Sequence, residues 1–225
     1  MSSSCGKIHL IIGPMRSGKT SELLRRKRRS EYANKKCLLI KYYKDTRYDP
    51  VIGSTERIVT HDLVSDEAIV STGNSLRQTL MSVKDLSTYR CLYIDEIQFY
   101  DDAAEVCDDL ANRGYDVTVS GLQGDFQRKI FKSVSDLIPL CEDVVQLTAI
   151  DPVTGNEAPF TYRISSEKEQ EVIGNTDKYI AVDRAHYLQL TQVQPPVQQP
   201  VQPPVEPPVP QKVGSGEKNL PSSLP

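Results

Sequence analysis

The stretch IHLIIGPMRSGKTSELL at residues 8–24 decides the fold of this chain. Within it, residues 13–20 fit the pattern G-x-x-x-x-G-K-[ST], after an apolar run and before a segment with helical spacing. A Gly/Ser-rich turn could match by chance, but the flanking strand and helix patterns favour a phosphate-binding loop. In such a loop Lys19 reaches the β- and γ-phosphates, and the Thr20 hydroxyl binds Mg²⁺. We therefore expect a nucleoside triphosphate to contact Gly13, Pro14, Met15, Arg16, Ser17, Gly18, Lys19 and Thr20.

Short apolar runs alternate with segments of helical spacing along the first 150 residues. Each run is apolar throughout or nearly so, which is typical of a strand covered on both faces. Alternating strands and helices predict a parallel sheet with right-handed crossovers. The predicted fold class is α/β, a P-loop (RecA-like) parallel sheet core flanked by helices. The predicted strands are residues 8–12, 37–42, 91–94 and 117–120, and the predicted helices are residues 21–34, 75–83 and 101–113, the last followed by Gly114 as a cap.

Changes in composition divide the chain into three regions. Residues 1–147 form the predicted core domain, and residues 148–190 form a small lobe with a short strand at 160–164 and a loop at 171–179. Residues 191–225 contain most of the 15 prolines, which predicts a disordered tail that samples polyproline II. A solvated spacer is favoured over a PxxP ligand for an SH3-type partner.

The overall charge and the cysteines narrow the class of protein. The net charge is −3, so nothing global attracts nucleic acid. We interpret the basic run RRKRR at residues 25–29 as a partly solvated helix face rather than a nucleic-acid or localisation signal. Five cysteines are scattered without a C-x-x-C pair, and no apolar run nears the roughly 20 residues that span a bilayer. We expect a soluble, cytoplasmic protein with no nucleic-acid or membrane partner.

The second half of the predicted site is CLYIDEIQF at residues 91–99. This apolar strand ends in two adjacent carboxylates, at the mouth of the sheet where the phosphate loop also lies. Asp95 is placed to hold Mg²⁺ directly or through water, and Glu96 to accept a proton from an attacking hydroxyl as the catalytic base. The alternative is that the two carboxylates only cap the following helix. We also assign Ile97 and Gln98, the next two residues, to the triphosphate site.

Several longer motifs are distributed along the chain. They are GPMRSGKTSELLRR, KYYKDTRY, THD at 60–62, YIDEIQFY, GDFQRKIF, LIPLCEDVVQLTA and EVIGNTDKY. Together they resemble thymidine kinases of the cellular and poxvirus type (type II), collinearly from about Lys7 to Tyr187, which is far more specific than the phosphate loop alone. The resemblance implies that ATP, with Mg²⁺, phosphorylates the 5′-hydroxyl of thymidine or deoxyuridine in nucleoside salvage for DNA synthesis. It also implies a homo-oligomer, commonly a tetramer.

The resemblance also implies a position for the nucleoside. The family's catalytic glutamate falls on Glu96, its pocket-lining aromatic on Phe126, and the tyrosine of its lasso loop on Tyr179. That loop, here residues 172–179, wraps the pyrimidine largely through main-chain groups. Without the family, ordinary core packing would explain both aromatic residues equally well. The implied nucleoside site consists of Met15, Leu122, Phe126, Thr161, Val172, Ile173, Gly174, Asn175 and Tyr179.

The sequence departs from the family most clearly in the small lobe. Family members usually pin this lobe with zinc through two pairs of cysteine-type ligands, which fall here on Asp151 and Thr154, and on Asp183 and His186. Only His186 is a good zinc ligand, so we expect no bound zinc. Other packing must then replace the folding energy that a zinc site supplies.

Two further departures lie next to the implied nucleoside pocket. Gln123 stands where many members have Asp, and Asp125 stands where a small polar residue is common. They leave open a deoxynucleoside kinase of broadened specificity, and the altered lobe leaves open a non-catalytic NTP-binding regulatory protein. Arg47 and Arg128 are candidates to stabilise transition-state charge, and Asp45 could help to hold the metal.

Overall fold

The computed structural model describes residues 5–45, 56–60, 64–164 and 178–193. All of them belong to one compact unit, Met1–Val193. The predicted Pro-rich tail lies outside the described residues from residue 194 onward. Among the described residues, every helix is too short or too polar to span a bilayer.

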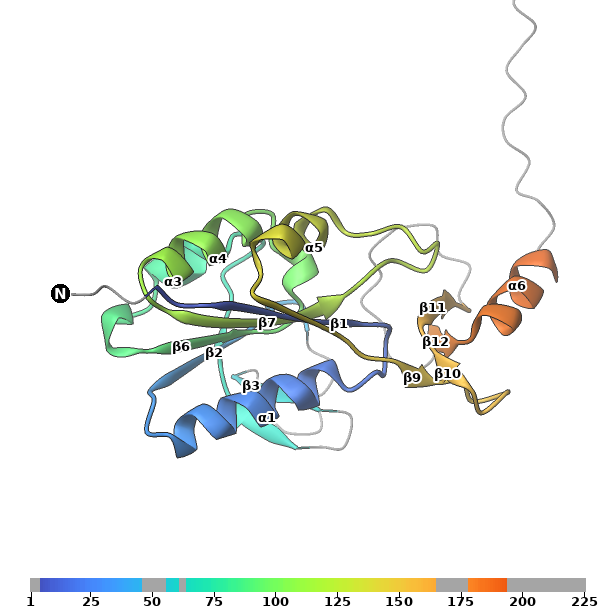
Figure 1. The fold of residues 1–225 in the computed structure, drawn as a ribbon, viewed down its shortest axis with the longest axis horizontal. Coiled ribbons are helices and arrows are strands. Elements are labelled where there is room, and N and C mark those ends of the chain that lie inside the picture. Colours follow the sequence, from blue (N-terminus) through green and yellow to red (C-terminus); the bar gives the residue numbers. More distant parts are fainter. Residues whose placement is uncertain (1–4, 46–55, 61–63, 165–177, 194–225) are drawn as a thin grey trace, which may run out of the picture. The chain divides into compact units, whose positions relative to one another are not determined.

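A six-stranded sheet runs through the middle of this unit, in the order β5-β2-β6-β7-β1-β8 (Figure 1). Every pairing within it is parallel, which confirms the predicted α/β class. Four of these six strands were predicted, and β5 and β8 were not. Strand β5 is only two residues long, and β8 alternates half-buried with exposed residues, so neither gives a long apolar run in the sequence. The strands are β1 Ile8–Gly13, β2 Cys37–Lys41, β5 Ile69–Val70, β6 Cys91–Ile94, β7 Asp116–Leu122 and β8 Asp143–Gln146.

Helices cover both faces of the sheet (Figure 1). Helix α1 (Lys19–Tyr32) packs on one face, and helices α3 (Leu76–Met81), α4 (Ala103–Asn112) and α5 (Lys132–Leu137) pack on the other. A hydrophobic core lies on each side of the sheet, between the sheet and its helices. Strand β1 contributes side chains to both cores, because successive side chains of a strand point to opposite faces. The three predicted helices are confirmed with ends within two residues, whereas the six-residue α5 was not predicted.

Shorter elements connect these layers. An antiparallel hairpin forms from β3 and β4, and three single turns of 3₁₀ helix occur in the connections. These elements are β3 Arg57–Val59, β4 Ser65–Glu67, η1 Leu86–Thr88, η2 Ile97–Phe99 and η3 Ile138–Leu140.

The described residues of the predicted small lobe form two antiparallel strand pairs and a helix. Strand β9 (Ala149–Ile150) pairs with β10 (Glu157–Ala158), and β11 (Phe160–Arg163) pairs with β12 (Tyr179–Val182). Strand β11 confirms the strand predicted at 160–164. Helix α6 (Arg184–Val193) was not predicted, and it continues past residue 190, where the tail was expected to begin.

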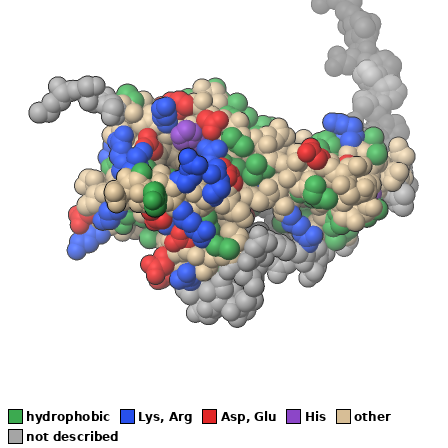
Figure 2. Space-filling model, turned by 60° about the horizontal axis from the view of Figure 1, so that its bottom comes forward, with side chains coloured by type: hydrophobic (Ala, Val, Ile, Leu, Met, Phe, Trp, Pro, Cys, Tyr) green, Lys and Arg blue, Asp and Glu red, His purple; other side chains and the backbone are tan. Residues whose placement is uncertain are grey.

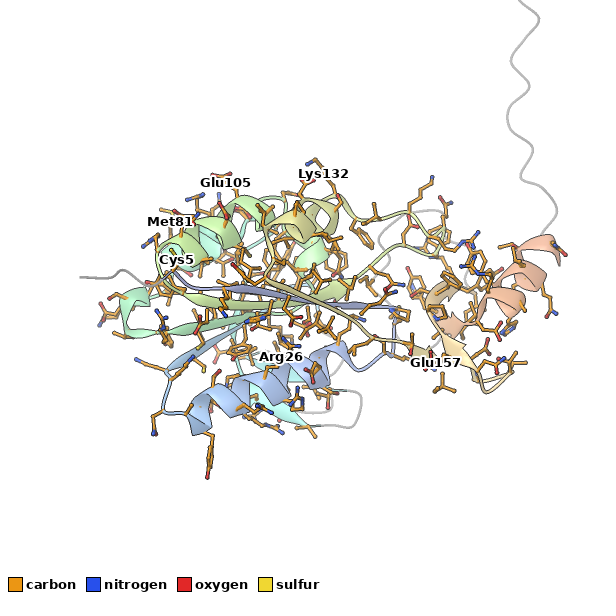
Figure 3. All side chains as sticks on the ribbon, in the orientation of Figure 1. Cys5, Arg26, Met81, Glu105, Lys132 and Glu157 are labelled. Atoms are coloured by element: carbon orange, nitrogen blue, oxygen red, sulfur yellow. The ribbon has the colours of Figure 1, made fainter. Side chains whose placement is uncertain are left out.

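The basic run lies in α1, as predicted. Arg26, labelled in Figure 3, forms an ion pair with Glu22 at 2.8 Å. Lys27 is buried and forms an ion pair with Asp66 at 2.9 Å. Figure 2 shows blue and red side chains intermixed on this face of the molecule. These intramolecular pairs support the interpretation of the run as a helix face that serves the fold.

Candidate active site

The phosphate loop joins the end of β1 to the start of α1. Gly18 has φ 81°, a left-handed conformation that glycine adopts without a steric penalty. At Gly13, an added Cβ would lie 2.4 Å from Ser17 Oγ and 2.7 Å from the Leu147 carbonyl oxygen. There is therefore no room for a side chain at Gly13, and the loop can turn tightly enough for its backbone N–H groups to approach a phosphate.

Lys19 and Met15 connect the phosphate loop to itself and to strand β11. Lys19 Nζ donates to the Pro14 carbonyl oxygen at 2.7 Å, so the ammonium group lies against the loop. The Met15 N–H donates to the Thr161 hydroxyl of β11 at 3.0 Å. Arg16 is exposed, with φ 62°. The loop thus contacts the small lobe through Met15 and Thr161, two residues predicted for the nucleoside site.

Asp95 follows β6 and joins three parts of the site. Its Oδ2 accepts from the Thr20 hydroxyl at 2.9 Å, and its Oδ1 accepts from the Ser120 hydroxyl at 2.5 Å. Burial and, second, the neighbouring Glu96 charge raise the pKa of Asp95 to about 6, against the opposing effect of the Ser120 and Thr20 hydrogen bonds. The charge of Asp45 raises the pKa further. Asp95 therefore faces the phosphate loop, as the order of strands and loops predicted.

Thr20 and Asp95 fit a magnesium site that a bound triphosphate completes. In the described part of the chain, no group of three or more His, Cys, Asp or Glu side chains could hold a metal ion. Mg²⁺ commonly takes only one or two protein carboxylates, with waters and substrate phosphates as its other ligands. The hydroxyl and carboxylate oxygens are the hard ligands that this ion prefers.

Glu96 adopts a backbone conformation that is uncommon outside glycine. Its φ is 54° and its ψ is 44°, and its half-buried carboxylate accepts through Oε2 from Gln98 Nε2 at 2.6 Å. Residues held in this region cost about 1–3 kcal/mol and cluster at functional sites. The Glu96 side chain makes no capping hydrogen bond to η2, which weakens the capping alternative. The next residue, Ile97, is fully buried in the core, so its side chain cannot contact ATP.

The small lobe holds two aromatic residues of the predicted nucleoside site through one arginine. The buried Arg163 guanidinium lies 3.9 Å from the Phe126 ring centroid and 5.1 Å from the Tyr179 ring centroid. Its Nε and Nη2 donate to the Tyr179 hydroxyl at 3.1 and 2.5 Å. Arg163 was not predicted for the site, because an arginine inside a short strand gives no pattern that separates it from a surface residue.

Other predicted residues are placed less directly. Leu122 is half-buried at the end of β7 beside the core. Arg128 lies 4.4 Å from the ring centroid of Tyr187, a residue of the unpredicted helix α6 whose hydroxyl donates to the Phe126 carbonyl oxygen. Arg47 lies outside the described residues. So do Val172, Ile173, Gly174 and Asn175 of the predicted lasso loop.

The four residues at the family's zinc positions form a hydrogen-bonded cluster. Asp151 Oδ2 accepts from the Asp183 N–H at 2.9 Å and from His186 Nδ1 at 2.8 Å. Asp183 Oδ2 accepts from the Thr154 hydroxyl at 2.8 Å, and its Oδ1 accepts from the His186 N–H at 2.7 Å. We call these four residues the lobe cluster. They do not fit zinc, because they provide no thiolate and their oxygen and nitrogen atoms are hydrogen-bonded to one another.

The geometry as a whole defines a class of protein. A phosphate loop after β1 is joined to an aspartate after β6, two places away in the strand order, by the hydrogen bond from the loop threonine. This arrangement is that of an α/β P-loop nucleotide-binding protein.

Comparison with known proteins gives the family. The family model described as thymidine kinase matches residues 6–187, and the chain belongs to the thymidine kinase family. Thymidine kinase 1 of Dictyostelium discoideum is 46% identical over 183 residues, 81% of this chain and 78% of that protein. The cytosolic thymidine kinase of Homo sapiens is 43% identical over 194 residues, 86% of this chain and 78% of that protein. The thymidine kinase of vaccinia virus (strain Western Reserve) is 44% identical over 183 residues, 81% of this chain and 97% of that protein.

Proposed function

We propose that this protein transfers the γ-phosphoryl group of ATP to the 5′-hydroxyl of thymidine, and of deoxyuridine, in the salvage of DNA precursors. The observation that carries the proposal is the 2.9 Å hydrogen bond between Thr20 and Asp95. It brings the phosphate loop and the acidic strand end together and leaves Glu96 as the adjacent carboxylate. The names of the family and of its relatives support thymidine as the nucleoside.

Each group has a defined part in this transfer. Lys19 and the loop N–H groups bind the β- and γ-phosphates and orient them toward the acceptor. Glu96 takes the proton of the 5′-hydroxyl while the 5′-oxygen of the nucleoside forms a bond to the γ-phosphorus. The bond between the γ-phosphorus and the oxygen that bridges it to the β-phosphorus breaks, and ADP leaves. Mg²⁺, held by Thr20 and Asp95, would neutralise charge on the phosphate oxygens. Phe126 and Tyr179 supply flat apolar surface for the pyrimidine.

The contacts of Gln123 and Asp125 favour thymidine over a broadened specificity. Gln123 Nε2 donates to the Pro159 carbonyl oxygen at 2.6 Å, and its Oε1 accepts from Gln146 at 2.9 Å. Asp125 Oδ1 accepts the N–H groups of its own turn, at residues 127 and 129. The side chains at both of these positions therefore make hydrogen bonds within the protein.

We also propose that the small lobe is stable without zinc, since the lobe cluster makes the connections that zinc would make. Metal analysis of the purified protein should find far less than one zinc per chain; about one zinc per chain would refute this. As a matched control, Asp151→Cys, Thr154→Cys and Asp183→Cys together with His186 create a Cys₃His set, and this variant should bind zinc.

Further assignments extend the proposal. The name of the human relative supports a cytosolic location. The resemblance to the family supports a homotetramer, and the net charge of −3 supports the absence of a nucleic-acid partner. The domain division at residues 147 and 190, and the tail as a spacer or SH3-type ligand, remain predictions. Size-exclusion chromatography with light scattering tests the tetramer.

One assay tests the central proposal. The protein is incubated with ATP, Mg²⁺ and each deoxynucleoside in turn, and formation of monophosphate and ADP is followed. We expect thymidine and deoxyuridine to be phosphorylated at least tenfold better than deoxycytidine or purine deoxynucleosides. Comparable rates for all nucleosides would support the broadened kinase instead. ATP binding without any monophosphate would support the non-catalytic alternative.

A further inference from the structure

Gln98 is placed between the proposed catalytic base and the neighbouring strand. Its side chain is buried, with Nε2 2.6 Å from Glu96 Oε2 and Oε1 3.0 Å from the Leu122 backbone nitrogen. At Gly121, an added Cβ would lie 2.6 Å from Gln98 Oε1, so the absence of a side chain there gives the amide its room. We infer that Gln98 is a positioning residue, which fixes the Glu96 carboxylate relative to the sheet rather than contacting ATP as its place in the sequence suggested.

The chemistry of the amide matches its two partners. An amide offers a donor and an acceptor at opposite corners, and here the donor meets a carboxylate while the acceptor meets a backbone N–H. A lysine at this position could donate to Glu96 but could not accept from Leu122. A glutamate could accept from Leu122 but would repel Glu96. Glutamine is the residue of this length that satisfies both partners.

The anchor matters because a base works only over a short range. A general base must lie about 2.6–3.2 Å from the oxygen that carries the proton, and a misplacement of about 1 Å can cost about a hundredfold in rate. Glu96 has several rotatable bonds on an unusual backbone conformation. The hydrogen bond from Gln98 connects its carboxylate to the backbone of β7, a strand in the middle of the sheet.

The substitution Gln98→Glu separates the two ends of this connection. It keeps an oxygen to accept from the Leu122 N–H, but it replaces the donor to Glu96 with a carboxyl group that repels the Glu96 carboxylate. This inference rests on the proposed role of Glu96. We expect kcat for thymidine to fall by about tenfold or more, while KM for thymidine and ATP change less than about threefold. The matched control is Gln78→Glu on the exposed side of α3, which should leave both parameters unchanged.

A double-mutant cycle distinguishes positioning from a general structural role. In a Glu96→Gln background there is no base to position, so Gln98→Glu should slow the reaction by less than about twofold. An equal loss in both backgrounds, or wild-type kcat in the single variant, would overturn the inference. If Gln98→Glu is unfolded by thermal melting, Gln98→Met takes its place in the same cycle. A Glu96→Gln variant with full activity would instead refute the proposed base, which keeps the two failures distinguishable.

Discussion

The phosphate-loop corner and the small lobe differ in how they are held together. At the corner, the Asp95 carboxylate accepts hydrogen bonds from the hydroxyls of Thr20 and Ser120. In the lobe, the residues at the four zinc positions have other chemistry, yet they still contact one another through hydrogen bonds. Two chain segments can therefore stay connected when hydrogen bonds replace metal ligands, whereas a group that takes part in the reaction cannot be replaced by one of different chemistry.

The largest effect expected from this comparison is at the reacting group. Glu96→Gln keeps the size of the side chain but removes the proton acceptor, so kcat for thymidine should fall by about a hundredfold or more. Steady-state kinetics with thermal melting as a folding check measures this. Glu105→Gln, the same substitution on the exposed face of α4 (Figure 3), should not change kcat. A loss of less than about fivefold at Glu96 would contradict its role as the base.

A smaller effect is expected in the lobe cluster. Asp151→Asn keeps one acceptor oxygen and replaces the other with an NH₂ group. Either the Asp183 N–H and His186, or the N–H groups of residues 153 and 154, then lose their acceptor, which should lower the free energy of unfolding by about 2–4 kcal/mol. Thr154→Val removes the hydroxyl that donates to Asp183 at 2.8 Å and accepts from the Asn156 N–H at 3.3 Å, and it should cost about 1 kcal/mol. Chemical denaturation of both variants gives the ranking. Equal stabilities for the wild type and Asp151→Asn would show that the lobe is held by something other than this cluster.

The corner and the lobe should also differ in which kinetic parameter they control. Arg163→Met removes the cation between Phe126 and Tyr179 and leaves the buried Tyr179 hydroxyl without two donors. We expect KM for thymidine to rise about tenfold with kcat changed much less, because the aromatic surface for the base is no longer fixed.

Two substitutions sharpen this test. Arg163→Lys should not restore the wild-type value, since lysine lacks the planar guanidinium. Arg184→Met on the exposed start of α6 is the control. A fall in kcat at unchanged KM would place Arg163 with the reacting groups instead.

The same contrast explains how far the sequence could predict the structure. The corner was predictable because its residues are contiguous motifs at strand ends, and a parallel sheet brings such ends to one edge. The hydrogen bond between Gln98 and the Leu122 N–H could not be predicted, because it depends on how η2 packs beside β7. Arg163 and α6 were missed, since their contacts join β11, β12 and residues near 126, and no local pattern records them.

One signal for α6 was present but not used. Asp183 directly precedes α6, and its carboxylate accepts the His186 N–H, as a residue before a helix does when it caps the first turn. An Asp followed by apolar residues at helical spacing would have predicted the start of this helix. Its end could not be predicted in the same way, because the described helix runs up to the proline-rich segment without a glycine to stop it.

The smallest effect expected is the part of the acid dependence of stability that comes from Asp183 in the lobe cluster. The His186 N–H, followed by the side chains of Asn156 and Thr154, lowers the pKa of Asp183 to about 2. An aspartate whose pKa is lowered on folding stabilises the protein above its ordinary value near 4, and this contribution is lost as the pH falls toward 2. The difference in melting temperature between the wild type and Asp183→Asn should therefore shrink as the pH is lowered from 5 to 2. A constant difference over that range would mean that the ionised carboxylate of Asp183 does not contribute, and that the cluster holds the lobe by neutral hydrogen bonds only.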